Sequence, residues 1–201
     1  MEKVAETAYP IHNLLKHRWS PRAFSDRRVE PATLRSLFEA ARWAASCANE
    51  QPWNFIVATK DEPQEFERML NCLTEGNIGW AKNAPVLIIS VARLDFEKSG
   101  GVNRTCYYDV GQSLAQMALE AVAEGLQIHQ MAGIVVDKVR EVYGIPEGWD
   151  PVTGIAVGYV GDPNMLPEKR REMELGHSAR KPSRSFVFSG RWAEPSKLFT
   201  E

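Results

Sequence analysis

Residues Asp109–Leu126 read DVGQSLAQMALEAVAEGL and carry the longest helical pattern of the chain. Gly125 is a residue type that commonly ends a helix, and the small residues in the pattern let other backbone segments approach closely. Apolar side chains recur at helical spacing, at Val110, Leu114, Met117, Ala118, Ala121 and Val122. The pattern predicts a long central helix that is buried on several sides.

The segments around this helix alternate between extended and helical patterns. The continuous apolar run Pro85–Val91 predicts a strand that is buried on both faces. Further strands are expected at Trp53–Ala58 and Val152–Val160. Further helices are expected from Pro31 to between Ala45 and Ala48, at Glu62–Leu73 and at Val135–Val142. This mixed order, in which helices dominate, predicts an α+β fold rather than a regular βαβ winding.

The composition is that of an ordinary globular chain. Its 201 residues are 44% hydrophobic and 25% charged, and this length predicts a single domain, residues 1–201. The net charge of −2 gives no reason to expect nucleic-acid binding. The longest apolar stretch, Ala84–Ala92, is too short to span a bilayer, and the N-terminus lacks the apolar core of a signal peptide. We therefore expect a cytoplasmic protein with no membrane association.

The motifs of several enzyme classes are missing from the sequence. It contains no G-x-G-x-x-G, no P-loop, no H-E-x-x-H and no G-x-S-x-G. The four histidines are not at metal-ligand spacing, and the widely spaced Cys47, Cys72 and Cys106 predict neither a disulfide framework nor a metal site. If the chain is an enzyme, we expect a bound cofactor to carry the chemistry.

Two arginines and a hydroxyl lie within the five-residue stretch RWSPR at 18–22. The proline disfavours a long helix, and in an extended segment Arg18, Ser20 and Arg22 share one face. Two guanidinium groups beside a hydroxyl suit a phosphate dianion. The alternative is that both arginines lie on the surface and pair with acids such as Asp26 or Glu30.

A second polar cluster lies in the stretch AASCANEQPW at 44–53. Its small side chains would let a flat ligand lie against the backbone, and Ser46, Asn49 and Gln51 supply donors and acceptors for the ligand's rim. The alternative is an ordinary helix end followed by a turn, with Asn49 in the left-handed conformation. Spacing alone favours this alternative.

The order and spacing of these blocks resemble the nitroreductase family of FMN-dependent oxidoreductases. The resemblance begins with R-x-S-x-R-x-F at Arg18–Phe24 and continues with A-A-R-W-A-x-S-x-x-N-x-Q-P-W-x-F-x-V at Ala40–Val57. It covers nearly the whole chain through further blocks at Asn77, Asn83–Pro85, Asp109–Leu126, Met131–Gly133, Gly158-Tyr159 and Arg180–Pro182.

The resemblance implies a fold and a chemistry. The fold would be a central, mostly antiparallel sheet surrounded by helices, in an intertwined homodimer. The chemistry would use resident FMN, NADH or NADPH as reductant, and nitroaromatics, quinones or similar conjugated acceptors in a ping-pong mechanism without a catalytic side chain. Alternatives are a non-catalytic flavin-binding or interaction protein on the same scaffold, or a specialised member that dehalogenates reductively or fragments flavin.

The resemblance also implies cofactor-binding positions. Arg18, Ser20 and Arg180 match positions that hold the phosphate and ribityl end of FMN. Ser46, Cys47 and Asn49 match a block that the second subunit contributes to the same flavin. The remaining matches are Arg22 near the pyrimidine edge, Asn77 on the ring, and Ala132 and Gly133 in a turn whose backbone N–H faces flavin N5.

Some positions depart from the family pattern. Ala45 stands where proline is common, and Cys47 where serine is common. Trp80 stands where some members carry a lysine near the flavin, so we expect it either as a wall of the substrate pocket or as a core residue. His129 is expected to be structural, with substrate contact as the alternative.

The C-terminal tail ends in an aromatic stretch that contains Phe186, Phe188 and Trp192. Aromatic side chains of this kind need a surface to pack on. We expect the stretch either to fold back onto the core of its own chain or to pack on a partner subunit.

Overall fold

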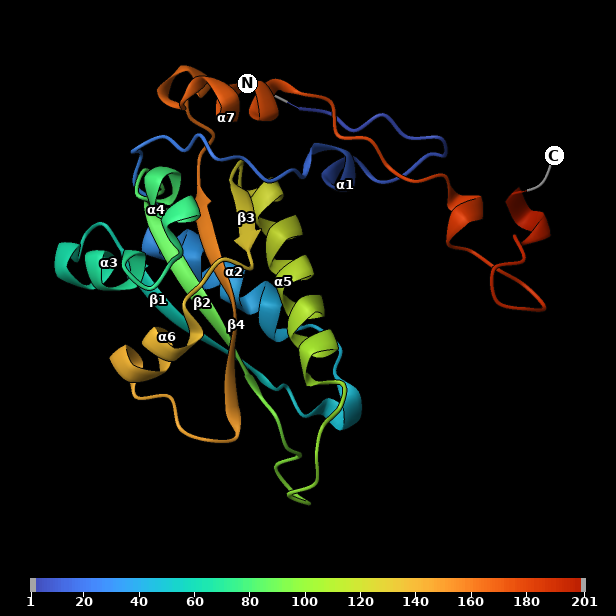
Figure 1. Cartoon of the computed structure of the whole chain (residues 1–201), viewed down its shortest axis with the longest axis horizontal. Coiled ribbons are helices and arrows are strands. Elements are labelled where there is room, and N and C mark those ends of the chain that lie inside the picture. The colour runs from blue at the N-terminus through green and yellow to red at the C-terminus, as the bar shows by residue number, and fades with distance from the viewer. Residues whose placement is uncertain (1–2, 200–201) are drawn as a thin grey trace.

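A four-stranded antiparallel sheet forms the centre of the structure (Figure 1). The computed structural model describes residues 3–199. Its strands are β1 (Trp53–Thr59), β2 (Val86–Arg93), β3 (Gln127–Met131) and β4 (Trp149–Gly158), in the order β1-β2-β4-β3. The predicted α+β class and the mostly antiparallel sheet are confirmed.

Strand β2 lies in the interior of the sheet and is buried along nearly its whole length, as its continuous apolar sequence predicts. Successive side chains of a strand point to opposite faces. Leu87, Ile89 and Val91 therefore join one hydrophobic cluster, whereas Val86 and Ile88 join the other. The sheet thus has an apolar core on each face.

Helices cover both faces of the sheet. On one face lie α2 (Pro31–Arg42) and the long α5 (Cys106–Ala123), which pack on each other. The other face is covered by α3 (Pro63–Leu70), α4 (Glu75–Ala81) and α6 (Val136–Tyr143). The predicted long helix is confirmed as α5. The expected burial on several sides is wrong for the single chain, because α5 buries one apolar stripe against the sheet and leaves residues such as Tyr107 and Tyr108 exposed.

The remaining helices and turns belong mainly to the two ends of the chain. Helix α1 (Asn13–His17) and helix α7 (Glu168–Leu175) lie beyond one end of the sheet (Figure 1). Four short 3₁₀ turns complete the structure: η1 (Cys47–Asn49), η2 (Pro163–Met165), η3 (Ser183–Ser185) and η4 (Lys197–Phe199).

Several sequence-based element boundaries are wrong. The helix that begins at Pro31 ends at Arg42 instead of at Ala45–Ala48, because the small polar residues that follow turn into a loop. The helix expected at Glu62–Leu73 ends at Leu70, where the chain turns to bury Cys72. The sequence does not predict strand β3, because polar side chains interrupt its apolar pattern.

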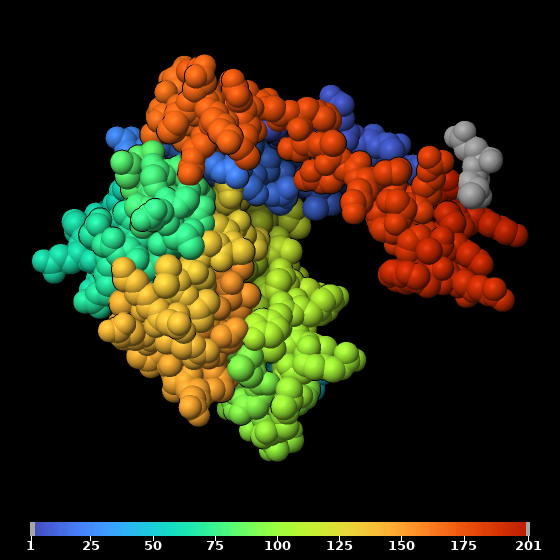
Figure 2. Space-filling view, in the orientation of Figure 1, coloured from blue at the N-terminus to red at the C-terminus, as the bar shows by residue number. Residues whose placement is uncertain are grey.

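The C-terminal segment of residues 182–199 projects away from the body of the molecule (Figure 2). The Phe186 side chain is 60% exposed and that of Trp192 is 88% exposed. Phe188 packs edge-on against Trp192, with ring centroids 5.2 Å apart. The expectation that this stretch folds back onto its own core is therefore wrong. No helix within residues 3–199 is long and apolar enough to cross a membrane.

Candidate functional site

Three arginines line one cavity of about 320 Å³, which also borders α7 through Met173 and Glu174. Arg18 and Arg22 come from the segment before the sheet and Arg180 from the segment after α7, and Ser20 lines the same cavity. Within residues 3–199 none of these three guanidiniums forms an ion pair. The predicted convergence of Arg18, Ser20 and Arg22 is present.

The alternative in which these arginines pair with surface acids is wrong, since the carboxylate of Glu30 lies 3.6 Å from Arg28 instead. Burial and the positive charge of Arg180 both lower the pKa of Arg18. An anion in the cavity would remove this like-charge repulsion, because a phosphate oxygen can accept hydrogen bonds from both groups. The cavity therefore has the chemistry of an anion site.

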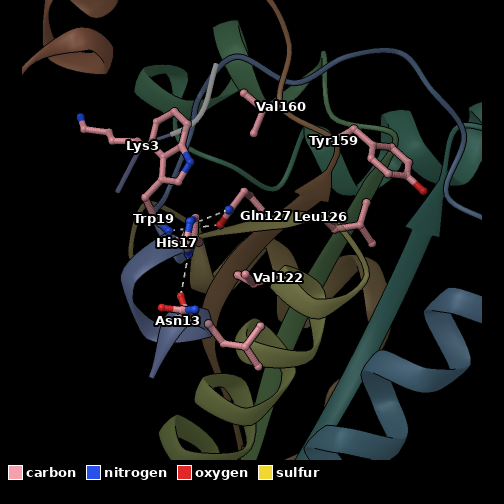
Figure 3. Close-up of a pocket in the computed structure, with 11 residues that line it drawn as sticks. Lys3, Asn13, His17, Trp19, Val122, Leu126, Gln127, Tyr159 and Val160 are labelled. Carbon is pink, nitrogen blue, oxygen red and sulfur yellow. Dashed lines mark hydrogen bonds between the residues drawn. The ribbon is translucent and has the colours of Figure 1, made fainter. Parts of the chain in front are cut away.

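The segment His17–Ala23, which we call the arginine segment, has almost no regular secondary structure, and three side chains hold its backbone. The amide of Gln127 accepts the N–H of Trp19 at 3.1 Å and donates to the carbonyl of His17 at 2.8 Å, beside a second cavity of about 470 Å³ (Figure 3). One carboxylate oxygen of Glu174 accepts the backbone N–H groups of Arg22 at 2.8 Å and Ala23 at 3.0 Å. Tertiary contacts thus fix the backbone positions from which the Arg18 and Arg22 side chains extend.

His129 supplies the third of these contacts. Its Nδ1 lies 2.8 Å from the carbonyl oxygen of Pro21, so the imidazole donates from Nδ1. Burial lowers the pKa of His129 to about 4, which keeps the ring neutral at neutral pH. The ring also lines the arginine cavity and packs on Trp80, with centroids 4.5 Å apart. The structural role expected for His129 is therefore present.

Trp80 is 1% exposed and belongs to the core, so the expectation that it walls a substrate pocket is wrong. Its indole N–H donates to Oδ1 of Asn77 at 3.3 Å. The amide nitrogen of Asn77 in turn donates to the carbonyl of Gly133 at 3.1 Å. Trp80 therefore connects Asn77 and Gly133 to His129 and to the arginine cavity.

The turn at Ala132-Gly133 packs closely against α4. A Cβ at Gly133 would lie too close to the side-chain ends of Thr74 and Asn77, so both side chains would have to move. The Gly133 carbonyl accepts the backbone N–H of Thr74 at 3.0 Å, while its own N–H donates to no acceptor among residues 3–199. The turn thus leaves one backbone donor without a protein partner.

The second predicted cluster forms a strained loop, which we call the 46–51 loop. Ala48, Asn49 and Gln51 all have positive φ, near 52°, 58° and 51°. This conformation costs most residue types free energy, and such strain concentrates at functional sites. The Cys47 N–H donates to a carboxylate oxygen of Asp109 at 3.1 Å, and Ser46 Oγ accepts the Gln51 N–H at 3.0 Å. The turn predicted at Asn49 is present.

The 46–51 loop and the arginine segment lie at opposite ends of the sheet. The loop precedes Trp53, which pairs with Ala92, whereas His129 lies in register with Leu87 across β4. Leu87 and Ala92 are five residues apart on β2, which corresponds to roughly 17 Å at about 3.4 Å per residue. One chain therefore brings together Arg18, Ser20, Arg22 and Arg180, links Asn77, Ala132 and Gly133 to them, and leaves Ser46, Cys47 and Asn49 apart.

Sequence reasoning missed Gln127, Glu174 and Asp109. Glu174 lies in a run of charged residues that is typical of a solvated helix, and nothing in that run marks it as buried. Asp109 and Gln127 frame the predicted central helix, where polar residues are common. No group of three or more histidine, cysteine or acidic side chains in the described part of the chain could hold a metal ion.

The chain is similar in sequence and in fold to known proteins. The family model for the Nitroreductase family matches residues 15–79 and 72–159. A crystal structure described as an oxidoreductase containing FMN is 34% identical, with a TM-score of 0.89, and the match covers 94% of this chain and 96% of that chain.

Two curated relatives also match. A protein of Polynucleobacter asymbioticus, provisionally named an NADH dehydrogenase/NAD(P)H nitroreductase, is 26% identical over 77% of this chain and 85% of its own. The iodotyrosine deiodinase of Haliscomenobacter hydrossis is 24% identical over 85% of this chain and 88% of its own. The family model spans well over half of the chain, and the chain belongs to the Nitroreductase family of oxidoreductases.

Proposed function

We propose that the protein is an FMN-dependent oxidoreductase that uses NADH or NADPH to reduce flat conjugated acceptors such as nitroaromatics or quinones. The observation that carries the proposal is the cavity in which Arg18, Arg22 and Arg180 converge and form no ion pair with any residue from 3 to 199. Guanidinium groups with no carboxylate partner fit a terminal phosphate monoester. The likeness to an oxidoreductase containing FMN supports the same cofactor.

In this proposal each residue contacts a different part of the cofactor. Arg18, Arg180 and Ser20 hold the phosphate and the adjoining ribityl hydroxyls. Arg22 lies toward the pyrimidine edge, where a cation stabilises the negative charge that develops on reduction. The free N–H of Gly133 and the amide of Asn77 orient the ring, and Ala132 precedes that turn.

FMN supplies the two-electron redox chemistry when it is bound, and no side chain acts as nucleophile. Burial raises the pKa of the Cys72 and Cys106 thiols, so both stay protonated and unreactive near neutral pH. Cys47 is exposed, and its backbone N–H is already used by Asp109. Reductant and acceptor would occupy the same pocket in turn, which is the ping-pong mechanism.

We further propose that the site is completed by a second copy of the chain in an intertwined homodimer. The 46–51 loop lies too far along the sheet to reach the arginine cavity of its own chain. The projecting C-terminal segment exposes Phe186, Trp192 and Leu198, which a partner surface would bury.

Truncation before Phe186 should yield a folded body that sediments as a monomer and loses flavin. A truncated protein that keeps both dimer and flavin would contradict this role of the segment.

Reductive dehalogenation is the second candidate function, favoured by the match to the iodotyrosine deiodinase. The same cavity would hold FMN in either case, so the two candidates differ in the acceptor. A non-catalytic flavin-binding protein would also fill the cavity but would not turn over.

Cofactor identity and reduction test the proposal. Cofactor released by heat should co-migrate with FMN, and NADH or NADPH should bleach the yellow colour without oxygen. Addition of a nitroaromatic, a quinone or an iodinated phenol should then restore the colour, and the fastest of these identifies the acceptor class. Released FAD, or no flavin under saturating FMN, would contradict the cofactor. A yellow protein that neither nicotinamide bleaches would contradict the enzyme.

A further inference from the structure

Two acidic side chains are buried among residues 3–199. Asp109 and Glu174 are each 2% exposed. Removing a carboxylate from water costs several kcal/mol, and an apolar side chain of the same volume is often at least as stable. Glu174 accepts two backbone N–H groups and Asp109 accepts one, each from a segment that the proposed function places against FMN.

Glu174 reaches the arginine segment from α7. It is the buried residue of this helix, whereas the neighbouring Met173 and Leu175 are 58% and 55% exposed. One carboxylate oxygen accepts the N–H groups of Arg22 and Ala23, and the other is buried without a hydrogen-bond partner in the described part of the chain. A carboxylate with one unsatisfied oxygen is a costly way to fill a buried position, so packing alone does not explain why glutamate stands here. The two hydrogen bonds fix the backbone of Arg22 and Ala23 beside the arginine cavity.

Asp109 reaches the 46–51 loop from the first turn of α5. Its carboxylate accepts the N–H of Cys47, directly before the residues with positive φ. A strained loop keeps its conformation only where its surroundings hold it. The bond from Cys47 ties the loop to α5, whose inner face is buried in the core.

We propose that Glu174 and Asp109 are positioning residues of the FMN site, one for each half of it. The inference rests on the proposed function, because it assumes that both segments contact FMN. Each carboxylate holds its segment in the binding conformation before the cofactor arrives, so less ordering is required on binding. An amide oxygen can accept the same hydrogen bonds, so glutamine and asparagine should keep most of the effect.

The test measures FMN affinity and amide hydrogen exchange in matched variants. E174M and D109L put an apolar side chain of similar length in place of each acceptor. E174Q and D109N keep an acceptor, and E172A is a control on the exposed side of α7. E174M should weaken FMN binding about tenfold or more and speed exchange at the Arg22 and Ala23 amides. D109L should likewise weaken FMN binding about tenfold or more and speed exchange at the Cys47 amide. E174Q and D109N should bind within about threefold of wild type, and E172A should be unchanged.

Each remaining outcome has a defined meaning. Wild-type affinity in E174M or D109L, or unchanged exchange at those amides, overturns the positioning role of that residue. Folded E174Q or D109N proteins that bind as poorly as the apolar variants overturn it as well. If an apolar variant does not fold, E174A and D109A replace it under the same criteria. A wild-type protein that does not bind FMN overturns the proposed function itself, which separates the two failures.

Discussion

The two halves of the candidate site hold their backbones in opposite ways. The arginine segment contains no residue with positive φ, and Gln127, His129 and Glu174 hold it from outside. The 46–51 loop adopts positive φ at three of its six residues and is closed largely by its own Ser46 and by Asp109. One half takes its geometry from tertiary contacts, and the other stores local strain.

The difference matches what each half would present to a ligand. Guanidinium groups must be aimed at a phosphate, and long side chains need a fixed starting point. A loop of small residues presents backbone and short polar groups. The strained backbone conformation of a short segment is enough to orient these groups. Substitutions far from the arginines in sequence should therefore disturb the first half, whereas the second half, apart from its bond to Asp109, should respond mainly to local changes in backbone freedom.

We expect the largest loss of stability from substitution of Trp80, which lies beneath the arginine segment. Trp80 packs on His129 and on Phe24 and is almost fully buried. Trp80→Ala should lower the free energy of unfolding by about 3–5 kcal/mol, because it leaves a large cavity. Denaturant unfolding measures the loss. A loss below about 1 kcal/mol would show that Trp80 is not the core contact described here.

Removal of a guanidinium should act on the cofactor rather than on the fold. Arg18→Ala should weaken FMN binding by about 1.5–3 kcal/mol, the value of one charge-assisted contact, with little change in unfolding free energy. Fluorescence titration with FMN measures the affinity. Arg68→Ala is the matched control, because Arg68 pairs with Glu65 on the exposed side of α3. Equal loss in both variants would contradict an anion site at Arg18.

Acidification should weaken the arginine half through His129. Burial holds the pKa of His129 at about 4 in the fold, below the 6.5 of the unfolded chain. The contribution of the neutral ring is fully present above pH 6.5 and is lost as pH falls toward 4, because the unfolded chain binds the proton first. The slope should be at most about 1.4 kcal/mol per pH unit. His129→Gln should flatten this part of the stability profile, and identical profiles would argue against the buried neutral ring.

A pair of glycine substitutions should give opposite signs in the two halves. Ala48→Gly relieves a positive φ and should raise stability by up to about 1 kcal/mol, after the entropy cost of glycine. Ala23→Gly, in the arginine segment, gains no such relief and should lower stability by about 1 kcal/mol. Thermal unfolding compares the two variants. Two losses of equal size would show that the loop is not strained at Ala48.

Much of this arrangement is visible in the sequence, and the missing parts share a physical cause. The apolar run at Pro85–Val91 and the helical repeat at Asp109–Leu126 predict the core, because burial on a strand or helix leaves a periodic trace. The alternation of Arg18, Ser20 and Arg22 likewise predicts a shared face. These signals are local, so one segment is enough to read them.

The parts that sequence reasoning missed depend on contacts between distant segments. Gln127 and His129 interrupt the pattern of β3, and their function is explained only by the backbone of the arginine segment. Glu174 lies 152 residues from Arg22 in sequence. Ala48 and Gln51 are residue types that rarely adopt positive φ, so the strain in the loop leaves no sequence signal.

The count of FMN bound to mixed dimers tests most directly whether two chains share each site. Arg18→Ala damages the arginine half, and Cys47→Trp places a bulky side chain on the exposed 46–51 loop. Homodimers of either variant should bind FMN weakly at every site. A mixed dimer purified through two different tags should recover tight FMN binding at half of its sites, because one site then combines two undamaged halves. A mixed dimer without recovery, or a wild-type monomer that retains FMN, would contradict the shared site.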